Sequence, residues 1–256
     1  MSIQKKSVLV LGGAGAVGEG IAKAFLDAQW QVVVPSRSES KLERLRERLA
    51  ATEGSGGAVG SDGTKLVTLV GDLGTVDGAE AIRTAVLERV GSLQAVVASL
   101  GGWKQGVPLT RVSLEVWERI LHDNLTSHFL AARTFLPAVA ASGTRGTYTF
   151  LGGFSAETPY PGAAPMSITG AAQIMMMRAL AEENTAFGVR VNELLLGPII
   201  TRVRPQGDPE WLRAEEVGQV AVRLASDAGA HINGRVLNLV ERSRMAQVLA
   251  EMPEAG

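Results

Sequence analysis

The residues with the clearest chemical meaning lie near the start of the chain, where Gly12, Gly15 and Gly18 recur at every third position. Glycine has no Cβ, so such a loop can turn tightly and bring backbone N–H groups close to an anion. The loop follows the apolar run Val8–Leu11 and precedes Gly20–Ala28, which has helical periodicity. A strand, a glycine turn and a helix start in this order predict a dinucleotide-binding loop. We expect five residues to face the pyrophosphate: Gly12, Gly15, Ala16, Val17 and Gly18.

The end of the next apolar run indicates which dinucleotide the loop serves. After Val34 and Pro35 come Ser36 and Arg37, with no acidic residue before Glu39. An acid here would hydrogen-bond the ribose 2′-hydroxyl of NAD, whereas a base accommodates the 2′-phosphate of NADP. Arg37 can bind a phosphate with paired charge-assisted bonds, and Ser36 can add a donor. The sequence therefore favours NADP(H) over NAD(H). The alternative is a solvated arginine at the start of a helix.

Apolar runs alternate with helix-period segments along the whole chain, and these elements must position the loop. We expect strands at Val8–Leu11, Val32–Val34, Leu66–Val70, Leu93–Ser99, Thr147–Leu151, Val189–Leu196 and Val236–Val240. Helices are expected at Gly20–Ala28, Ser40–Ala50, Asp77–Val90, Leu114–Ala141, Ser167–Phe187 and Glu215–Ala225. This order predicts an α/β fold, a single Rossmann-type domain over residues 1–256 with about seven parallel strands and helices on both faces of the sheet. Ligands of such sheets bind at the carboxyl ends of the strands.

Composition excludes several classes of function. The 256 residues are 46% hydrophobic and 20% charged, with a formal net charge of -1, so we expect no nucleic-acid partner. There is no cysteine, and the three histidines are scattered, so we expect no disulfide and no metal site. We find no signal peptide and no run long enough for a membrane span, so the expected location is cytoplasmic. The glycine-rich stretch 52–63 is interpreted as a flexible surface loop.

Over nearly its whole length the sequence resembles the short-chain dehydrogenase/reductase family. The matching motifs include Gly12–Gly18, Asp72-Leu73, Asn124-Leu125, the Val191–Thr201 segment and Ala225–Val236. The resemblance implies that Asp72 and Leu73 contact the adenine ring and that Thr201 contacts the nicotinamide carboxamide. It also implies that Asn124 holds a proton-relay water.

The catalytic positions of the family do not match. Its Tyr-x-x-x-Lys motif aligns Met166 with the tyrosine and Gly170 with the lysine. Its serine, about a dozen residues upstream, aligns with Gly153 or with Gly152. In the family the lysine lowers the pKa of the tyrosine, which is otherwise near 10, and also binds the nicotinamide ribose. Methionine and glycine cannot transfer a proton.

Other side chains are candidates for the missing chemistry. Tyr160 lies in the loop that lines the family's substrate pocket, so we name it with Asn124 as a catalytic candidate, although a tyrosine that only packs a proline-rich loop is the simpler interpretation. Lys104 could supply a charge and Trp103 a flat wall for a ligand, or they are a solvated lysine and a capping tryptophan. His128 shares a helical face with Asn124. We expect it at the surface or in a subunit interface.

The sequence leaves three functions open. The chain could reduce a small carbonyl or conjugated substrate with a substitute acid, or catalyse a non-redox reaction of the cyclase or dehydratase type in the same pocket. It could also bind NADP(H) without chemistry, as a sensor or an inactive subunit, and the fold alone does not choose among these. The long segment Leu114–Ala141 and the run Met175–Met177 resemble the family's interface helices. We therefore expect a homodimer or homotetramer.

Overall fold

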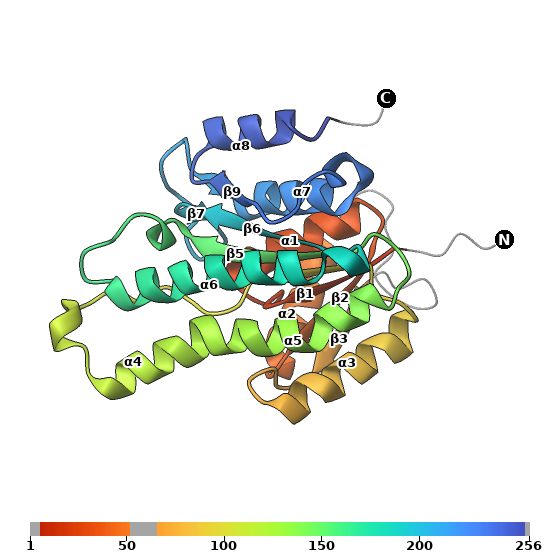
Figure 1. Cartoon of the computed structure of the whole chain (residues 1–256), viewed down its shortest axis with the longest axis horizontal. Helices are drawn as coiled ribbons and strands as arrows, with labels where there is room; N and C mark the ends of the chain where they lie inside the picture. The colour runs from red at the N-terminus through yellow and green to blue at the C-terminus, as the bar shows by residue number, and fades with distance from the viewer. Residues whose placement is uncertain (1–5, 52–65, 254–256) are drawn as a thin grey trace.

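The structure is a computed structural model that describes residues 6–51 and 66–253. The predicted loop 52–63 lies outside the described residues. Seven strands form one parallel sheet in the order β3-β2-β1-β4-β5-β6-β9 (Figure 1). They are β1 Ser7–Leu11, β2 Gln31–Ser36, β3 Leu66–Val70, β4 Ala95–Ala98, β5 Thr147–Gly153, β6 Arg190–Leu196 and β9 Val236–Leu239. The predicted Rossmann-type parallel sheet is confirmed.

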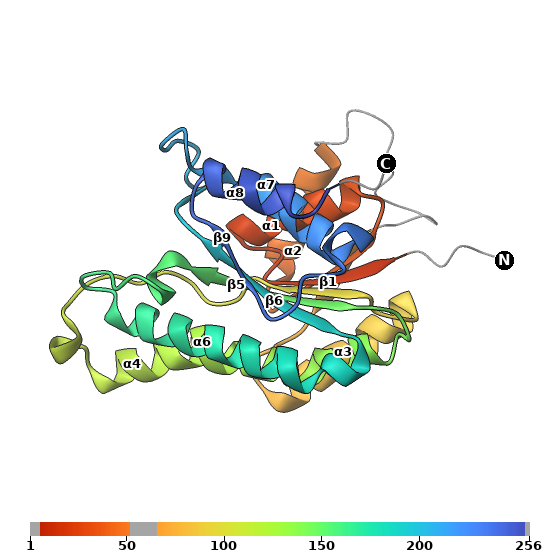
Figure 2. The same cartoon turned by 45° about the horizontal axis from the view of Figure 1, so that its top comes forward.

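Helices cover both faces of this sheet, as Figure 2 shows. On one face lie α1 (Ala16–Asp27), α2 (Glu39–Ala51), α7 (Ala214–Ala225) and α8 (Arg242–Ala250). On the other lie α3 (Val76–Val90), α4 (Leu114–Leu121), α5 (Ser127–Ala140) and α6 (Ala164–Glu183). Two further strands, β7 Ile199–Ile200 and β8 Leu212–Arg213, pair with each other outside the main sheet.

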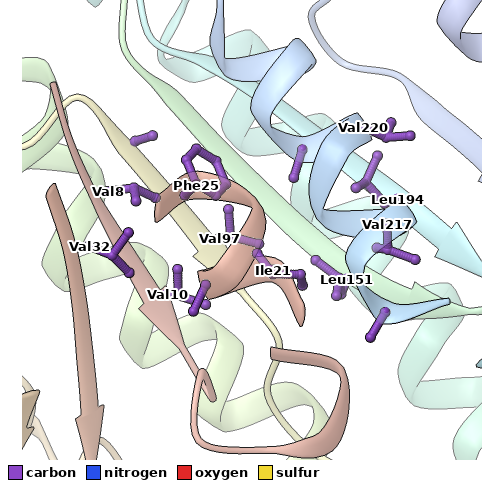
Figure 3. Packing of buried hydrophobic residues seen from close by; sticks show 14 of the residues in the cluster. Val8, Val10, Ile21, Phe25, Val32, Val97, Leu151, Leu194, Val217 and Val220 are labelled. Atoms are coloured by element: carbon purple, nitrogen blue, oxygen red, sulfur yellow. The ribbon is translucent and has the colours of Figure 1, made fainter. Parts of the chain in front are cut away.

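Each face of the sheet has its own hydrophobic core. Under α1 and α7, side chains from the central strands meet Ile21, Phe25 and Val217 (Figure 3). The opposite core contains Phe135 of α5 and Met177 of α6. Strands β1 and β4 are buried along their whole length, because helices cover them on both sides. That double burial is why these strands are continuously apolar in sequence rather than alternating.

The strand order reverses between β1 and β4, and this reversal positions the functional site. The chain leaves β1 toward α1 on one face and leaves β4 toward α4 on the other. The two connecting loops diverge there and leave a crevice at the carboxyl ends of the strands. This is the crevice that the alternating pattern predicts.

Besides shifts of up to four residues in the ends of elements, and the unpredicted strands β7 and β8, two elements differ from the sequence-based expectation. The predicted helix Leu114–Ala141 is interrupted by a π-helical turn, His122–Thr126, between α4 and α5. Helix α8 was not predicted. In the structure Arg242 at its start forms an ion pair with Glu216 of α7, and Val248 packs against the core. Within the described residues, no helix combines the length and the apolar character of a membrane span.

Candidate cofactor and active site

The glycine loop between β1 and α1 has a backbone that side chains would not permit. Gly12 has φ +75°, a left-handed conformation that favours glycine. A Cβ on Gly18 would collide with the Gly12 carbonyl oxygen, and the Gly15 N–H donates to that oxygen at 2.8 Å. Gly15 is also the N-cap of α1, and no side chain caps the helix. The first-turn N–H groups of α1 therefore remain available to an anion.

A cleft of about 700 Å³ lies beside this loop, at the reversal point of the sheet. It brings together most of the predicted site residues, namely Gly12, Gly15, Ser36, Arg37, Asp72, Leu73 and Asn124. Ala16 and Thr201 line a smaller neighbouring hollow of about 240 Å³ instead. Val17 and Gly18 belong to the first turn of α1, and Tyr160 lies in the loop after β5. Most of the predicted cofactor residues thus line one of two hollows beside the start of α1.

Two cations line the part of the cleft beside the end of β2. The Arg37 side chain is 80% exposed, and its Nε lies 4.0 Å from Asp72 Oδ1, so it is held only loosely. Lys41, which sequence reasoning missed, lines the same cleft from the first turn of α2. Its spacing of four residues from Arg37 was the available signal, because the helix that begins at Glu39 turns Lys41 back toward the strand end.

Asn124 holds the loop that follows β4. Its Oδ1 accepts a hydrogen bond from the Gly102 N–H at 2.9 Å, and its Nδ2 donates to the Ile120 carbonyl at 3.2 Å. Gly101 has φ +81°, and a Cβ on it would collide with the Asn124 side chain. The π-helical turn widens the helix at this residue and directs the amide toward the loop.

His128 corrects the sequence-based expectation of a surface or interface histidine. It is buried to 1% exposure against the Phe150 ring, 5.6 Å between centroids. Helix α5 follows the π-helical turn, and its buried face, which includes His128, lies on the sheet. Burial lowers the pKa of His128 to about 4. A hydrogen bond to the Leu100 backbone has the opposite, smaller effect and raises the pKa. A neutral His128 and Asn124 therefore both fix the loop after β4.

The residues aligned with the family's catalytic set lie at the carboxyl end of β5 and on the first turns of α6. Gly153 is exposed at the end of β5, and Met166 is half-buried in the first turn of α6. At Gly170, one turn further, a Cβ would lie 2.8 Å from the Cβ of Ala156 and 3.2 Å from its Cα. Ala156 belongs to the 3-10 turn Phe154–Ala156. That turn therefore fills the space beside the Gly170 backbone, where a side chain would begin.

A buried carboxyl group lies under α6. Glu193 of β6 is 0% exposed, and its Oε1 accepts from Gln173 Nε2 at 3.2 Å, while Oε2 has no hydrogen-bond partner among the described residues. A Cβ on Gly152 would collide with Oε1. Burial raises the pKa of Glu193 to about 8, opposed by the Gln173 hydrogen bond. Sequence reasoning missed this residue, and the only signal was a glutamate within the apolar run Val189–Leu196.

Tyr160 belongs to an exposed aromatic cluster. Its ring lies 5.5 Å from Trp103 and 5.6 Å from Phe154, edge-on to both. Lys104 and Trp103 line the mouth of the main cleft. Gly153 precedes Phe154 directly, so the cluster begins where β5 ends.

The smaller hollow is closed by an ion-pair network around Glu19 of α1. Arg202 Nε donates to Glu19 Oε2 at 2.8 Å, and Arg48 of α2 donates to Oε1 at 2.8 Å. Thr201 precedes Arg202, and its backbone pairs with Arg204 in a short antiparallel bridge. The network ties the segment after β7 to α1 and α2.

The fold, the glycine loop and the cleft at the sheet reversal define a nucleotide-binding α/β protein. The profile of a family described as short chain dehydrogenase matches residues 6–210. The chain belongs to this short-chain dehydrogenase family.

Curated relatives agree with this assignment. Glucose 1-dehydrogenase 2 of Bacillus subtilis is 25% identical, the match covering 91% of this chain and 92% of the relative. The 2,3-dihydroxy-2,3-dihydro-p-cumate dehydrogenase of Pseudomonas putida is 28% identical, covering 100% of this chain and 91% of the relative. These relatives are oxidoreductases of different substrates.

Solved structures share the fold. A short-chain type dehydrogenase/reductase from Mycobacterium ulcerans superimposes with a TM-score of 0.83 at 24% identity, covering 96% of this chain and 92% of that one. ElxO with NADP bound superimposes with a TM-score of 0.81 at 18% identity, covering 92% of this chain and 97% of that one.

Proposed function

We propose that this protein is an NADP(H)-binding oxidoreductase that acts on a small carbonyl-type substrate through non-standard catalytic machinery. The observation that carries the cofactor assignment is the pair of cations, Arg37 and Lys41, beside Ser36 in the cleft of the glycine loop. Two cations and a hydroxyl suit a phosphate better than a ribose hydroxyl. ElxO, a structural neighbour, was solved with NADP bound, which supports the same preference.

The chain's own residues bind and orient the cofactor. The uncapped start of α1 offers N–H groups to the pyrophosphate, from Gly15, Ala16, Val17 and Gly18, after the turn at Gly12. Asp72 and Leu73 flank the adenine end of the cleft, and Thr201 binds the nicotinamide carboxamide from the smaller hollow. Bound NADPH supplies the hydride that reduces a carbonyl carbon.

Proton transfer is the step for which the standard groups are replaced. Met166 and Gly170 carry no ionisable group, and the turn at Ala156 occupies the space next to Gly170. We propose Tyr160 as one proton donor. It lies six residues before Met166 in the sequence and belongs to the aromatic cluster that begins where β5 ends. A water held near Asn124 is the other source that we propose.

The contact between Ala156 and Gly170 also favours a second candidate function, a protein that binds NADP(H) without turnover. A site that had merely lost a lysine would keep an open space there. In this structure a Cβ added at position 170 would lie 2.8 Å from the Cβ of Ala156, closer than side chains normally approach each other. A sensor or inactive subunit needs the cofactor cleft but no proton donor.

Cofactor titration tests the assignment. By calorimetry, we expect NADPH to bind at least tenfold more tightly than NADH, because charge-assisted bonds to a phosphate contribute about 1.5–3 kcal/mol. Arg37→Ala should remove most of this preference. Arg44→Ala, an exposed arginine on α2 that does not line the cleft, is the matched control and should leave it unchanged. Equal affinities of the wild-type protein for the two cofactors would contradict the proposal.

A further inference from the structure

Three aromatic side chains form a platform outside both hydrophobic cores, where the loops after β4 and β5 meet. Trp103 and Phe154 are stacked, with centroids 6.1 Å apart and planes 19° apart. Tyr160 stands edge-on to Trp103 at 77° and to Phe154 at 86°. We refer to Trp103, Phe154 and Tyr160 as the aromatic platform.

Two of the three platform side chains are exposed to solvent, and Phe154 is half-buried. Trp103 is 50% exposed and Tyr160 is 38% exposed, and neither belongs to a core cluster. The loop residues 101–110 are exposed throughout. An exposed tryptophan among exposed neighbours leaves apolar surface in water, which is unfavourable unless a ligand covers it.

Backbone contacts hold the platform in place before any ligand binds. The Gly106 N–H donates to the Gly162 carbonyl at 2.9 Å, and Gln105 Nε2 donates to the Pro161 carbonyl at 3.1 Å. These bonds join the two loops that carry Trp103 and Tyr160. A pre-formed surface loses little conformational entropy when it binds a ligand.

The platform extends between the cofactor cleft and the end of β5. Trp103 lines the cleft, and Phe154 directly follows Gly153, which is exposed at the last position of β5. A flat ligand lying on the platform would therefore place one edge beside Gly153. The residues aligned with the family's catalytic set lie at this strand end and at the start of α6.

We propose that the aromatic platform binds the flat ring system of an aromatic carbonyl compound. Aromatic pairs prefer offset-stacked or edge-to-face geometry, and the platform presents both a stacked pair and a perpendicular ring. Each favourable ring pair corresponds to about a twofold to tenfold gain in affinity over burial of the same area. The carbonyl group of this ligand rests on the proposed function, whereas its flat ring is inferred from the platform alone.

Binding of two matched ketones tests the proposal. The probes are 2-acetylnaphthalene and its fully saturated analogue, methyl decahydronaphthyl ketone, titrated by calorimetry into the full-length protein with NADP⁺ present. No hydride can be transferred from NADP⁺, so binding is measured alone. We expect the dissociation constant of the aromatic ketone to be about tenfold lower than that of the saturated one. Quenching of Trp103 fluorescence should accompany the binding of the aromatic ketone.

Variants locate the effect. Trp103→Leu keeps an apolar side chain but removes the ring, so it should raise the dissociation constant of 2-acetylnaphthalene about fivefold to tenfold, and Trp103→Phe by less. Tyr160→Leu is a second test should the first variant unfold. Trp30→Phe is the control, because Trp30 is buried against Phe25 just before the amino end of β2, whereas the platform follows the carboxyl ends of β4 and β5.

The outcomes separate the two proposals. Equal affinity for both ketones, or unchanged affinity in folded Trp103→Leu and Tyr160→Leu proteins, would overturn the aromatic platform as a binding site. If 2-acetylnaphthalene binds as expected but none of the carbonyl compounds tested causes NADPH to be oxidised, the platform stands and the proposed reduction is contradicted.

Discussion

Gly170 and Ala156 show how closely single residues determine what this site can do. The sequence alone aligns Gly170 with the catalytic lysine of the family, but only the structure shows that Ala156 lies beside its backbone. The two residues lie on different elements, so their contact depends on how the turn after β5 meets α6. A lysine introduced at position 170 would therefore fit only if the space beside Ala156 were also enlarged.

This packing leads to a stability prediction. Gly170→Ala adds a Cβ that lies 2.8 Å from Ala156 Cβ, so it should lower the free energy of unfolding by about 1–3 kcal/mol, the usual cost of overpacking. Adding Ala156→Gly should recover most of the loss, although glycine makes the unfolded chain more flexible. Gly106→Ala is the control, because a Cβ there meets nothing within 4 Å. Urea unfolding measures the wild type, the single variants at positions 170 and 156, the double variant and the control, and additive effects in the double variant would contradict the contact.

The buried groups Glu193 and His128 predict an unusual pH dependence. The pKa of His128 is lowered in the folded protein from 6.5 to about 4, so His128 makes stability rise with pH between these values. The pKa of Glu193 is raised from 4.5 to about 8, so Glu193 makes stability fall as pH rises from 4.5 to 8. The two effects oppose each other between pH 4.5 and 6.5. Above pH 6.5 only the effect of Glu193 remains.

We therefore expect the free energy of unfolding to fall by about 2 kcal/mol between pH 6.5 and 8, at about 1.4 kcal/mol per pH unit. Glu193→Gln, which keeps the shape without the titration, should remove this decline. Glu88→Gln, at an exposed position on α3 that does not contribute to the pKa of Glu193, should retain it. Denaturant unfolding at a series of pH values measures the slopes. A wild-type protein with constant stability from pH 6.5 to 8 would show that Glu193 is not a buried neutral acid.

At the scale of elements, the sequence predicts those that local pattern determines. Strand β3 was predicted with its exact bounds, Leu66–Val70, and the other six strands of the main sheet to within two residues, because they are short apolar runs bounded by polar or glycine residues. Helix α8 has little periodic signal of its own. It is held by the distant ion pair between Arg242 and Glu216, which no local pattern contains. The π-helical turn at His122–Thr126 was likewise missed, since its sequence is compatible with a continuous helix.

The site residues divide in the same way. The cofactor loop and Arg37 could be predicted, because the signal lies within a few consecutive residues. Glu193 and the aromatic platform depend on which loops and strands become neighbours in the fold, whereas Lys41 lies only four residues after Arg37. Such neighbours are set by strand order and register, which the local pattern does not specify.

The ion-pair network of Glu19 yields a prediction for the segment after β7. Glu19→Gln removes the charge that Arg48 and Arg202 share, so amide hydrogen exchange over residues 201–204 should become several times faster. The affinity for NADPH should change little or fall, because Thr201 lies in that segment. Asp27→Asn removes the carboxylate of an exposed pair at the other end of α1 and serves as the control. Exchange that is identical in Glu19→Gln and wild type would mean that the network does not fix the segment.

At the scale of the whole molecule, one face of the sheet carries exposed apolar side chains. Leu114 is 69% exposed, Phe129 53% and Met175 61%, on α4, α5 and α6 respectively. Met177, from the same methionine run, is fully buried in the core instead. These helices cover the same face of the sheet in Figure 2. A second copy of the chain would remove these side chains from water.

We predict a homodimer or homotetramer that uses this face. Light scattering at micromolar concentration should give at least twice the 26.9 kDa mass of one chain. Phe129→Glu should shift the protein toward a monomer, because a carboxylate would be buried in the interface. Val203→Glu, at a similarly exposed apolar residue in the segment after β7, should not. A monomeric wild-type protein would contradict this prediction.

The central claim is that this protein combines altered catalytic machinery with an NADP(H)-binding scaffold. The rate of NADPH oxidation with simple ketones and aldehydes tests it most directly. We expect the wild-type rate to be slower than ordinary enzyme rates by about a hundredfold to ten-thousandfold, the typical contribution of general acid catalysis. A variant that combines Gly153→Ser, Met166→Tyr and Gly170→Lys with Ala156→Gly should be faster than wild type. The same variant without Ala156→Gly should gain less. A wild-type rate of about 1–100 per second would contradict the claim, and Tyr160→Phe would then show whether Tyr160 donates the proton.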